Sequence, residues 1–243
     1  MEAKIDSLDK LPPLPEGCFY RKIKTTLEVY DGEIAPLIDE NKALLDAGCG
    51  KKSLVAQYSD RVKLSVGMDV VLEAIKKNET RRDYVLGDAS RLPFAENTFD
   101  IVASQWMVEH IPNPEIVAAE VYRVLKPGGS LVVATNSFYH PMMLFSWVFP
   151  ARMRDWLKKV LLPSFIEEDT FPTYYRFNGL GRIHKTMTAA GFEKRFAAYT
   201  GCPFFLFSRT LLKLSEIYER ITQWAPLRPL KMHVVVHYVK KPD

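Results

Sequence analysis

The feature that most constrains the fold of this chain is a regular alternation of short apolar runs with segments of helical pattern. Five apolar runs lie at residues 43–48, 62–69, 83–88, 99–104 and 130–136. Helical patterns between them are Ser53–Tyr58, Val71–Asn78 and Pro114–Leu125. Strands that alternate with helices form βαβ units, whose parallel strands are covered on both faces and are therefore almost entirely apolar. We predict a doubly wound α/β fold.

The alternation stops after residue 137, and the remaining segments complete the predicted sheet. Residues 138–177 are rich in aromatic side chains and contain no clear strand pattern. A helical pattern follows at Leu180–Ala190, and strand patterns occur at Phe192–Tyr199 and Met232–Val239, separated by a long helical pattern at Phe204–Trp224. We predict a mostly parallel seven-stranded sheet with a helical insertion after strand five. The last two strands are expected to pair in antiparallel fashion.

The length of the chain suits a single α/β domain with an accessory element, since it has 243 residues. Residues 1–20 include the sequence LPPLPEG and are predicted to form an irregular leader. Residues 21–243 are expected to form one domain, with the insertion, or lid, at about 138–177. Residues 21–40 have a helical pattern, and its candidate apolar positions are Ile23, Leu27, Ile34 and Leu37.

Composition excludes several classes of protein. Only three cysteines occur, Cys18, Cys49 and Cys202, and this argues against a disulfide framework and against a structural zinc site. The sequence has no run of about 18 apolar residues that would span a membrane, and its first residues lack the apolar core of a secretory signal. The net charge of +4 is too small to predict a nucleic-acid partner. We expect a cytoplasmic protein.

The first apolar run leads into a glycine-rich turn at residues 46–50, with the sequence DAGCG. Glycine lets the backbone turn sharply and approach a ligand, because no β-carbon stands in the way. At the carboxyl end of a parallel strand, such a turn forms a ligand crevice. A dinucleotide fingerprint would have its third glycine at position 53, which is Ser53. The pattern therefore argues against NAD.

Acids stand at the ends of the next two runs. Asp69 ends the second run, and a carboxylate there accepts hydrogen bonds from both hydroxyls of a ribose. Asp88 ends the third run, where an acid accepts a hydrogen bond from the exocyclic amine of adenine. Three strand ends thus supply a glycine turn, a ribose acid and an adenine acid. This set is typical of a site for a nucleoside without phosphates.

Five segments, in order and with the family's spacing, resemble a known family. They are LLDAGCG (44–50), VGMD (66–69), GDASRLPF (87–94), FDIVASQWMVEHI (99–111) and RVLKPGGSLVVAT (123–135). In these segments the chain resembles the class I S-adenosylmethionine-dependent methyltransferases, specifically the large group that includes the ubiquinone-pathway enzymes. The resemblance extends over about residues 40–137. It implies S-adenosylmethionine as the cofactor.

The resemblance also implies which residues contact the methionine part of that cofactor. Gly48 and Gly50 would lie behind it, and Asp46 would help to hold its amino group indirectly. Ser104 and Gln105, just beyond the fourth strand, would line the same side. These five positions form the predicted methionyl end of the site.

The nucleoside end of the predicted site comes from the next two strands. The resemblance implies that Asp69 binds the ribose and that Asp88 and Ala89 frame the adenine. One position departs from the family pattern, because Lys52, after Lys51, stands where a third glycine is often found. The charge of Lys52 would attract the cofactor carboxylate; the alternative is a solvated lysine pair at a helix start.

Methyl transfer from a sulfonium needs mainly proximity and alignment, because the leaving group is already activated. A hydroxyl acceptor also needs a general base, and the candidates are His110, after the fourth strand, and His140, after the fifth. In some relatives a Glu-x-x-Glu-His pattern is linked to a divalent metal. Here Trp106 replaces the first acid beside Glu109 and His110, so we predict no metal. The remaining histidines are expected to be structural: His184, His233 and His237.

The insertion is expected to supply the acceptor pocket, because long connections of this kind are usually functional. It contains a dense apolar group, Met142, Met143, Leu144, Phe145, Trp147 and Phe149. Basic residues follow it: Arg152, Arg154, Lys158 and Lys159. An amphipathic helix of this composition at residues 142–162 is typical either of a membrane interface or of a lid that packs on the domain. Both alternatives favour an apolar or amphipathic acceptor.

The predicted function is transfer of a methyl group from S-adenosylmethionine to an oxygen of a small amphipathic or lipid-like acceptor. One alternative is a glycan or other polar acceptor, bound by Glu167, Asp169, Tyr175 and Arg176, although these residues would equally anchor the insertion. A second alternative is a non-catalytic cofactor-binding partner protein, for which Lys52 is the only argument. Nucleic acid is not an expected partner, and the oligomeric state is left open.

Overall fold

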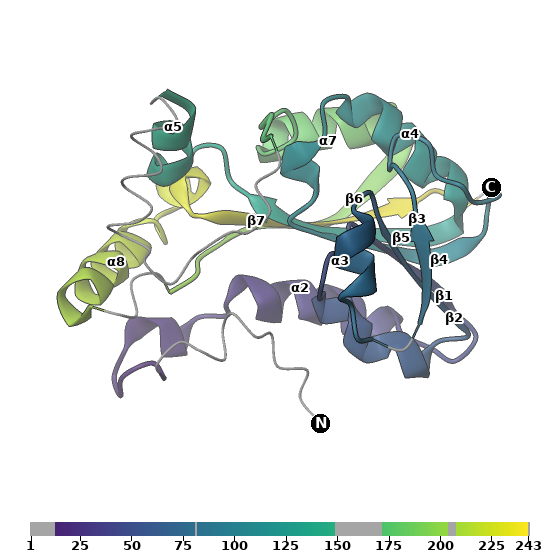
Figure 1. Ribbon diagram of the computed structural model, residues 1–243. Helices are drawn as coiled ribbons and strands as arrows, with labels where there is room; N and C mark the ends of the chain where they lie inside the picture. The colour runs from purple at the N-terminus through teal and green to yellow at the C-terminus, as the bar shows by residue number, and fades with distance from the viewer. Residues whose placement is uncertain (1–12, 81, 149–171, 204–207, 243) are drawn as a thin grey trace.

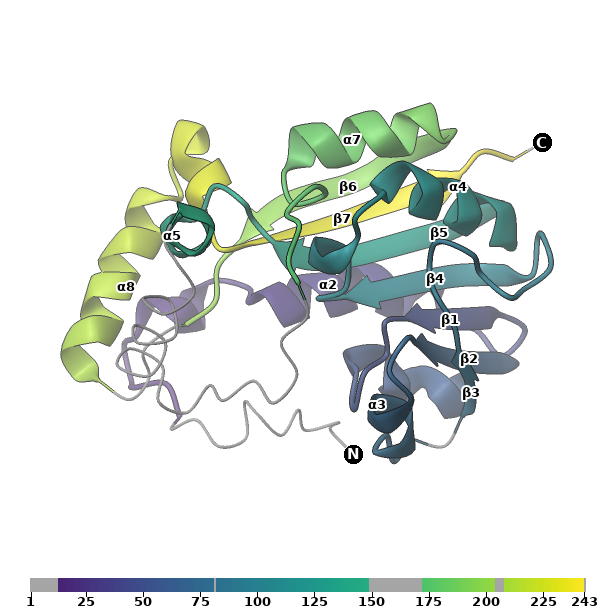
Figure 2. The ribbon, with the colours of Figure 1, turned by 45° about the horizontal axis from the view of Figure 1, so that its top comes forward.

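The fold is a seven-stranded sheet with the strand order β3-β2-β1-β4-β5-β7-β6, whose strands lie side by side in Figure 2. The computed structural model describes residues 13–80, 82–148, 172–203 and 208–242. The strands are β1 Ala43–Ala47, β2 Leu64–Asp69, β3 Asp83–Leu86, β4 Phe99–Gln105, β5 Leu125–Asn136, β6 Phe192–Thr200 and β7 His233–Lys240. Strands β1 to β5 are parallel, and β7 runs antiparallel to both β5 and β6. The predicted doubly wound, mostly parallel sheet is confirmed.

Helices cover both faces of this sheet (Figure 1). The helices are α2 Thr26–Ile34, α3 Leu72–Lys76, α4 Pro114–Val124, α5 Pro141–Val148, α7 Leu180–Ala189 and α8 Arg209–Ile221. The short 3₁₀ helices are η1 Phe19–Lys22, η2 Ala35–Leu37, η3 Leu54–Arg61, η4 Val108–His110 and η5 Ala225–Leu230. Helices α4 and α7 pack on one face, whereas α2 and η3 pack on the other. No helix among the described residues is long and apolar enough to cross a bilayer.

The predicted continuous helix at residues 21–40 is wrong, because the segment divides into η1, α2 and η2. Helix α2 has its own start signal: the Thr25 side chain accepts a hydrogen bond from the backbone of Glu28, and the Glu28 side chain accepts one from the backbone of Thr25. The residues that it buries are Thr26, Tyr30 and Ile34. The register of the buried face is therefore set by this capping box, and three of the four predicted apolar positions are only partly buried.

Smaller differences concern where individual strands begin and end. Strand β5 begins at Leu125, five residues before the predicted start, because Leu125 already pairs with Phe99 across a bulge. Strand β4 extends through Gln105, so Ser104 and Gln105 are its last residues. Strand β3 ends at Leu86, and Asp88 lies two residues beyond it. The carboxyl ends of the parallel strands nevertheless meet at one edge, where α/β proteins bind ligands.

Candidate active site

The turn after β1 has the geometry that its glycines predict. Gly48 has a φ of +77° and Gly50 a φ of +52°, in the left-handed region that side chains disfavour. The backbone N–H groups of Gly48 and Cys49 donate to the Met68 carbonyl oxygen at 2.8 and 3.0 Å, which ties the turn to β2. A β-carbon on Gly48 would lie 2.5 Å from Cγ of Met107. Glycine is therefore required here both by the backbone angle and by a close neighbour.

Asp69 points at this turn from the end of β2. Its Oδ2 accepts a hydrogen bond from the Gly50 backbone N–H at 2.8 Å, and its Oδ1 accepts one from the Val71 N–H at 2.9 Å. A carboxylate has about four acceptor positions, so these two bonds orient the group and leave lone pairs for a ligand. The side chain is also only partly buried. The structure thus brings the glycine turn and the predicted ribose acid together.

The predicted adenine end lies farther along the same edge. Asp88 is exposed, and its Oδ1 accepts a hydrogen bond from the Ser90 backbone N–H at 2.8 Å. Ala89 is buried against the apolar core beside Leu92. Among the described residues, no hydrogen bond joins Asp88 to the glycine turn. The Asp88 side chain therefore stabilises the loop that contains it. Its contact with the adenine stays a prediction.

Asp46 is fully buried, and its partner is Arg82, which the sequence analysis did not identify. The Nη2 atom of Arg82 lies 2.8 Å from Oδ2 of Asp46, and both side chains are almost completely buried. The hydroxyl of Ser53 donates to the same carboxylate oxygen. Burial raises the pKa of Asp46, and the charge of Arg82 opposes that shift. Asp46 is thus held below the turn by an ion pair and a hydroxyl.

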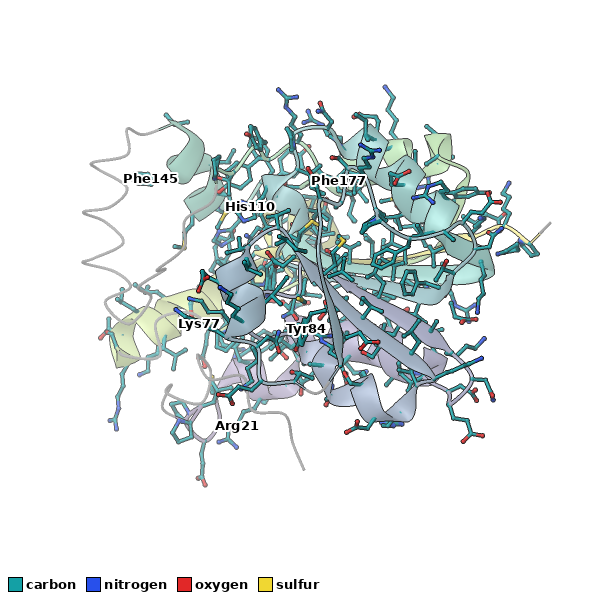
Figure 3. All side chains as sticks on the ribbon, turned by 45° about the vertical axis from the view of Figure 1, so that its right-hand side comes forward. Arg21, Lys77, Tyr84, His110, Phe145 and Phe177 are labelled. Carbon is teal, nitrogen blue, oxygen red and sulfur yellow. The ribbon has the colours of Figure 1, made fainter. Side chains whose placement is uncertain are left out.

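Gly67 in the middle of β2 makes this ion pair possible. A β-carbon at Gly67 would lie 2.9 Å from Nε of Arg82 and 3.0 Å from a ring carbon of Tyr84. The Arg82 guanidinium also lies 5.4 Å from the centre of the Tyr84 ring, which Figure 3 labels. A glycine inside a strand often marks the close approach of another group. Gly67 is therefore a sequence signal for a close neighbour, although it does not identify Arg82 as that neighbour.

The end of β4 contributes two differently placed side chains. Ser104 is buried, and its hydroxyl oxygen has no hydrogen-bond partner among the described residues. The Gln105 side-chain oxygen accepts a hydrogen bond from the Leu54 backbone N–H at 3.3 Å, at the start of η3. Trp106 follows with a φ of +57°, a strained angle for a large side chain. Strain of this kind is concentrated at functional sites.

The two candidate catalytic histidines have different surroundings. His110, labelled in Figure 3, has its Nδ1 atom 3.1 Å from the Pro172 carbonyl oxygen and is partly exposed. His140 is buried, its ring packs edge-on against Tyr218 with centres 5.6 Å apart, and its Nδ1 atom accepts a hydrogen bond from the Met142 backbone N–H at 3.3 Å. Burial lowers the pKa of His140 to about 4. His140 is therefore neutral at pH 7.

Glu109, the neighbour of His110, is hydrogen-bonded to the end of β5. It is buried and accepts hydrogen bonds from the Thr135 hydroxyl at 2.9 Å and from the Asn136 amide at 2.8 Å, both at the end of β5. It therefore joins η4 to the sheet. The part of the chain that the structure describes contains no group of three histidine, cysteine or acidic side chains placed to hold a metal.

His233 also lies at this edge, although the sequence analysis expected it to be purely structural. Because β7 is antiparallel, its first residue pairs with Asn136, the last residue of β5. The His233 ring packs on Trp106 with centres 4.5 Å apart, and its Nδ1 atom lies 2.8 Å from the Thr26 hydroxyl. Burial lowers the pKa of His233 to about 3. Strand alternation alone did not reveal that this histidine would lie beside the site.

Among the other predictions, the two distant histidines are placed as structural residues. His237 contacts Glu33 and Ser130 at 2.9 and 3.1 Å, and His184 lies on helix α7. The Arg176 guanidinium donates to the Pro112 carbonyl oxygen at 2.9 Å, which favours an anchoring role over sugar binding. Several predicted residues of the insertion lie outside the described residues: Phe149, Arg152, Arg154, Lys158, Lys159, Glu167 and Asp169.

Comparisons with known proteins agree with this geometry. Residues 45–133 match the family model described as a methyltransferase domain. The chain is 39% identical over 101 residues to a demethylmenaquinone methyltransferase of Renibacterium salmoninarum, covering 40% of this chain and 42% of that protein. It is 34% identical over 118 residues to a ubiquinone/menaquinone biosynthesis C-methyltransferase UbiE of Cereibacter sphaeroides, covering 42% and 47%. The chain thus matches less than half the length of these relatives.

Solved structures extend the likeness of the fold to most of the chain. A crystal structure of an S-adenosylmethionine-dependent methyltransferase from Mesorhizobium loti covers 87% of this chain and 98% of its own, with a TM-score of 0.56 and 16% identity. That identity shows the fold alone, and the family match adds the motif residues from β1 to β5. Fold, strand order and motifs agree: the fold is similar to that of S-adenosylmethionine-dependent methyltransferases, and residues 45–133 match the methyltransferase-domain family.

Proposed function

We propose that this protein transfers a methyl group from S-adenosylmethionine to a small apolar or amphipathic acceptor. The observation that supports this most directly is the contact between Asp69 and the glycine turn, 2.8 Å from Oδ2 to the Gly50 nitrogen. The Asp69 carboxylate, which has acceptor positions left for a ligand, thus lies beside the backbone of Gly50, which carries no side chain, at the carboxyl edge of the sheet. A nucleoside linked to an amino acid needs both features at once.

The residues at this edge fit the cofactor. A β-carbon on Gly50 would meet nothing within 4 Å, so the outer side of the turn is open. The Ser104 hydroxyl and Oδ1 of Asp46 are buried and lack hydrogen-bond partners among the described residues. Buried polar atoms without partners are rare in native proteins, and a bound ligand or water usually explains them. We assign the ribose to Asp69 and the methionyl part to Asp46, Gly48, Gly50, Ser104 and Gln105.

S-adenosylmethionine supplies a methyl group on a positively charged sulfur that leaves as a neutral thioether. The protein therefore needs to align the acceptor with the methyl carbon and to remove a proton from a hydroxyl acceptor. Transfer of the methyl carbon to an acceptor oxygen would leave the electron pair of the carbon–sulfur bond on the cofactor's sulfur. The hydroxyl proton must pass to a base at the same edge.

His110 is the better placed of the two candidate bases. A carbonyl oxygen only accepts hydrogen bonds, so the proton of the neutral imidazole lies on Nδ1, facing the Pro172 carbonyl. The Nε2 atom then has the lone pair and acts as the proton acceptor. His110 ends η4, the first element after β4, whose last residues Ser104 and Gln105 are assigned to the methionyl part of the cofactor. We assign the general base to His110.

His140 has the opposite tautomer. Its Nδ1 atom accepts the Met142 N–H, so the proton of the neutral ring lies on Nε2. In this form Nε2 donates a hydrogen bond and does not remove a proton. We assign His140 the role of a donor that orients a polar atom of the acceptor, at the start of the apolar helix α5.

The chemistry of the acceptor is inferred from the apolar residues around α5. Met142, Met143, Leu144 and Phe145 follow His140, and the Tyr175 hydroxyl lies 3.6 Å from the sulfur of Met143. The names of the two relatives refer to menaquinone and ubiquinone, and one name specifies methylation at carbon. We propose an apolar ring acceptor and keep oxygen as the proposed methylated atom.

The test is incubation of the purified protein with an apolar cell extract and methyl-labelled S-adenosylmethionine, followed by mass spectrometry and carbon-13 NMR of the product. A labelled methoxyl group supports the proposal, whereas a label on a ring carbon overturns the choice of oxygen. If calorimetry shows cofactor binding but no metabolite gains the label, the protein is a non-catalytic binder. Absence of cofactor binding would refute the whole proposal.

The two histidine roles are separated by their kinetic effects. We expect His110→Gln to lower kcat by about 10²-fold or more, the usual contribution of a general base, with little change in KM. His140→Gln should instead raise KM for the acceptor and change kcat little, because glutamine still donates a hydrogen bond. His184→Gln on helix α7 is the matched control. Equal effects of both substitutions on kcat and on KM would contradict this division of roles.

A further inference from the structure

Helix α8 presents a row of large apolar side chains to solvent. Leu214, Ile217 and Ile221 are 57%, 53% and 53% exposed, and Trp224, just after the helix, is 67% exposed. Leu214, Ile217 and Ile221 follow one another at intervals of three or four residues, so on a helix of about 100° per residue they lie within an arc of about 60°. Single exposed apolar residues need no explanation, but a continuous stripe marks an interaction surface.

A basic row borders this stripe. Arg209, Lys213 and Arg220 are exposed and lie on the adjacent side of the same helix, and the Arg220 guanidinium also packs over the Phe19 ring, 4.6 Å from its centre. The two acids of α8 are directed elsewhere: Glu219 is buried and pairs with Lys231, and Glu216 accepts a hydrogen bond from the Phe19 backbone N–H at 3.0 Å. The charged side chains on the outer surface of α8 are therefore all positive, and the exposed polar residue Thr210 lies beside the stripe.

The opposite side of α8 holds the helix on the protein. Leu212 is buried, the Ser215 carbonyl oxygen accepts a hydrogen bond from the Tyr20 hydroxyl at 3.1 Å, and the Tyr218 hydroxyl donates to the Leu230 carbonyl oxygen at 2.6 Å. Figures 1 and 2 show α8 at one end of the molecule, beside α5 and well away from β1, β2 and β3. The apolar stripe therefore faces outward and takes no part in the core.

We propose that this face of α8 docks on the surface of a membrane that contains anionic phospholipids. Apolar side chains next to a basic row are the composition of helices that lie in the interface plane, and a tryptophan favours the level of the headgroups. Anionic headgroups complement the basic row. A second copy of the chain would instead bring identical positive rows together. This inference does not depend on the proposed methyl transfer.

Docking in this orientation would also place the acceptor side of the site near the lipid. Tyr218 of α8 packs on His140, the residue at the start of α5. An apolar acceptor dissolved in the membrane would therefore have a short path to the edge of the sheet. The surface differs from the predicted contact of residues 142–162, most of which lie outside the described residues.

The test is co-sedimentation of the whole chain with vesicles of phosphatidylcholine alone and of phosphatidylcholine with phosphatidylglycerol. We expect binding to the anionic vesicles that weakens with salt, and at least a tenfold lower partition coefficient for the variant Leu214→Glu/Ile217→Glu. The variant Arg209→Glu/Lys213→Glu should lose the preference for phosphatidylglycerol. The control is Ile116→Glu on α4, where Ile116 is 49% exposed; it should bind like the parent protein.

A spectroscopic measurement reports the contact directly. Brominated lipids should quench the tryptophan fluorescence of the parent protein, and Trp224→Phe should remove most of that quenching. The proposal is overturned if the parent protein ignores anionic vesicles, or if Ile116→Glu loses as much binding as the stripe variant. It is also overturned if light scattering shows a dimer that the stripe variant converts to monomers. Circular dichroism and calorimetry with S-adenosylmethionine verify that each variant is folded.

Discussion

At the scale of single residues, the site depends on Asp69, which orients the glycine turn and is the proposed partner of the ribose. We expect Asp69→Ala to weaken S-adenosylmethionine binding by at least tenfold, or about 1.4 kcal/mol, because both ribose hydroxyls lose their acceptor. Calorimetry of the purified variant measures this. Asp60→Asn, at an exposed position in η3, is the control. Unchanged affinity in the Asp69 variant would refute the ribose assignment.

Residue identity and spacing were enough to predict that Gly48, Gly50 and Asp69 lie together, because their positions depend on strand ends and neighbouring backbone. Their roles in cofactor binding stay predictions. Identity and spacing were not enough for Arg82. Its side chain crosses β2 to reach Asp46, and that contact depends on the order of three strands and on the missing β-carbon of Gly67. Such a contact is set by tertiary structure, and no local pattern in the sequence encodes it.

At the scale of elements, the buried pair of Asp46 and Arg82 ties β1 to the segment before β3. Removal of one partner leaves a buried charge, which typically costs 3–5 kcal/mol. We expect Arg82→Met to destabilise the fold by about 3 kcal/mol, and Asp46→Asn/Arg82→Met to be clearly less destabilised than the sum of the single substitutions. Urea denaturation of the four proteins measures the coupling. Additive effects would mean that the pair does not interact.

The strands were predictable because parallel strands covered on both faces are apolar throughout, as in β1 and β4. The helices were less predictable. Residues 21–40 divide at the Thr25–Glu28 capping box, and the 3₁₀ helix η2 begins at Ala35, next to Pro36. Hydrophobic periodicity does not predict these boundaries, because they are set by hydrogen bonds at helix ends and by proline. Likewise, the position of His233 depends on the direction of β7.

At the scale of the whole molecule, two buried neutral histidines make stability depend on pH. The pKa of His140 is lowered to about 4 and that of His233 to about 3, both by burial, whereas an unfolded chain has a histidine pKa near 6.5. Below about pH 6.5 the unfolded state therefore binds more protons than the native state. Stability must fall as the pH decreases through this range, by up to about 1.4 kcal/mol per pH unit for each histidine.

Denaturant unfolding between pH 5 and 7 measures this dependence. Relative to the parent protein, His140→Gln should flatten the curve, because glutamine has no proton to gain. A parent protein whose stability does not change between pH 7 and 5 would contradict the burial of neutral imidazoles.

The position of β7 between β5 and β6 has a consequence for synthesis. During translation, residues 125–136 and 192–200 emerge long before residues 233–240, which supply the hydrogen bonds between them. Until then β5 has one unpaired side, and unpaired strand edges recruit strands from other chains. A nascent or truncated chain that lacks residues 233–240 is therefore expected to aggregate, and expression of this protein should depend strongly on chaperones that bind it on the ribosome.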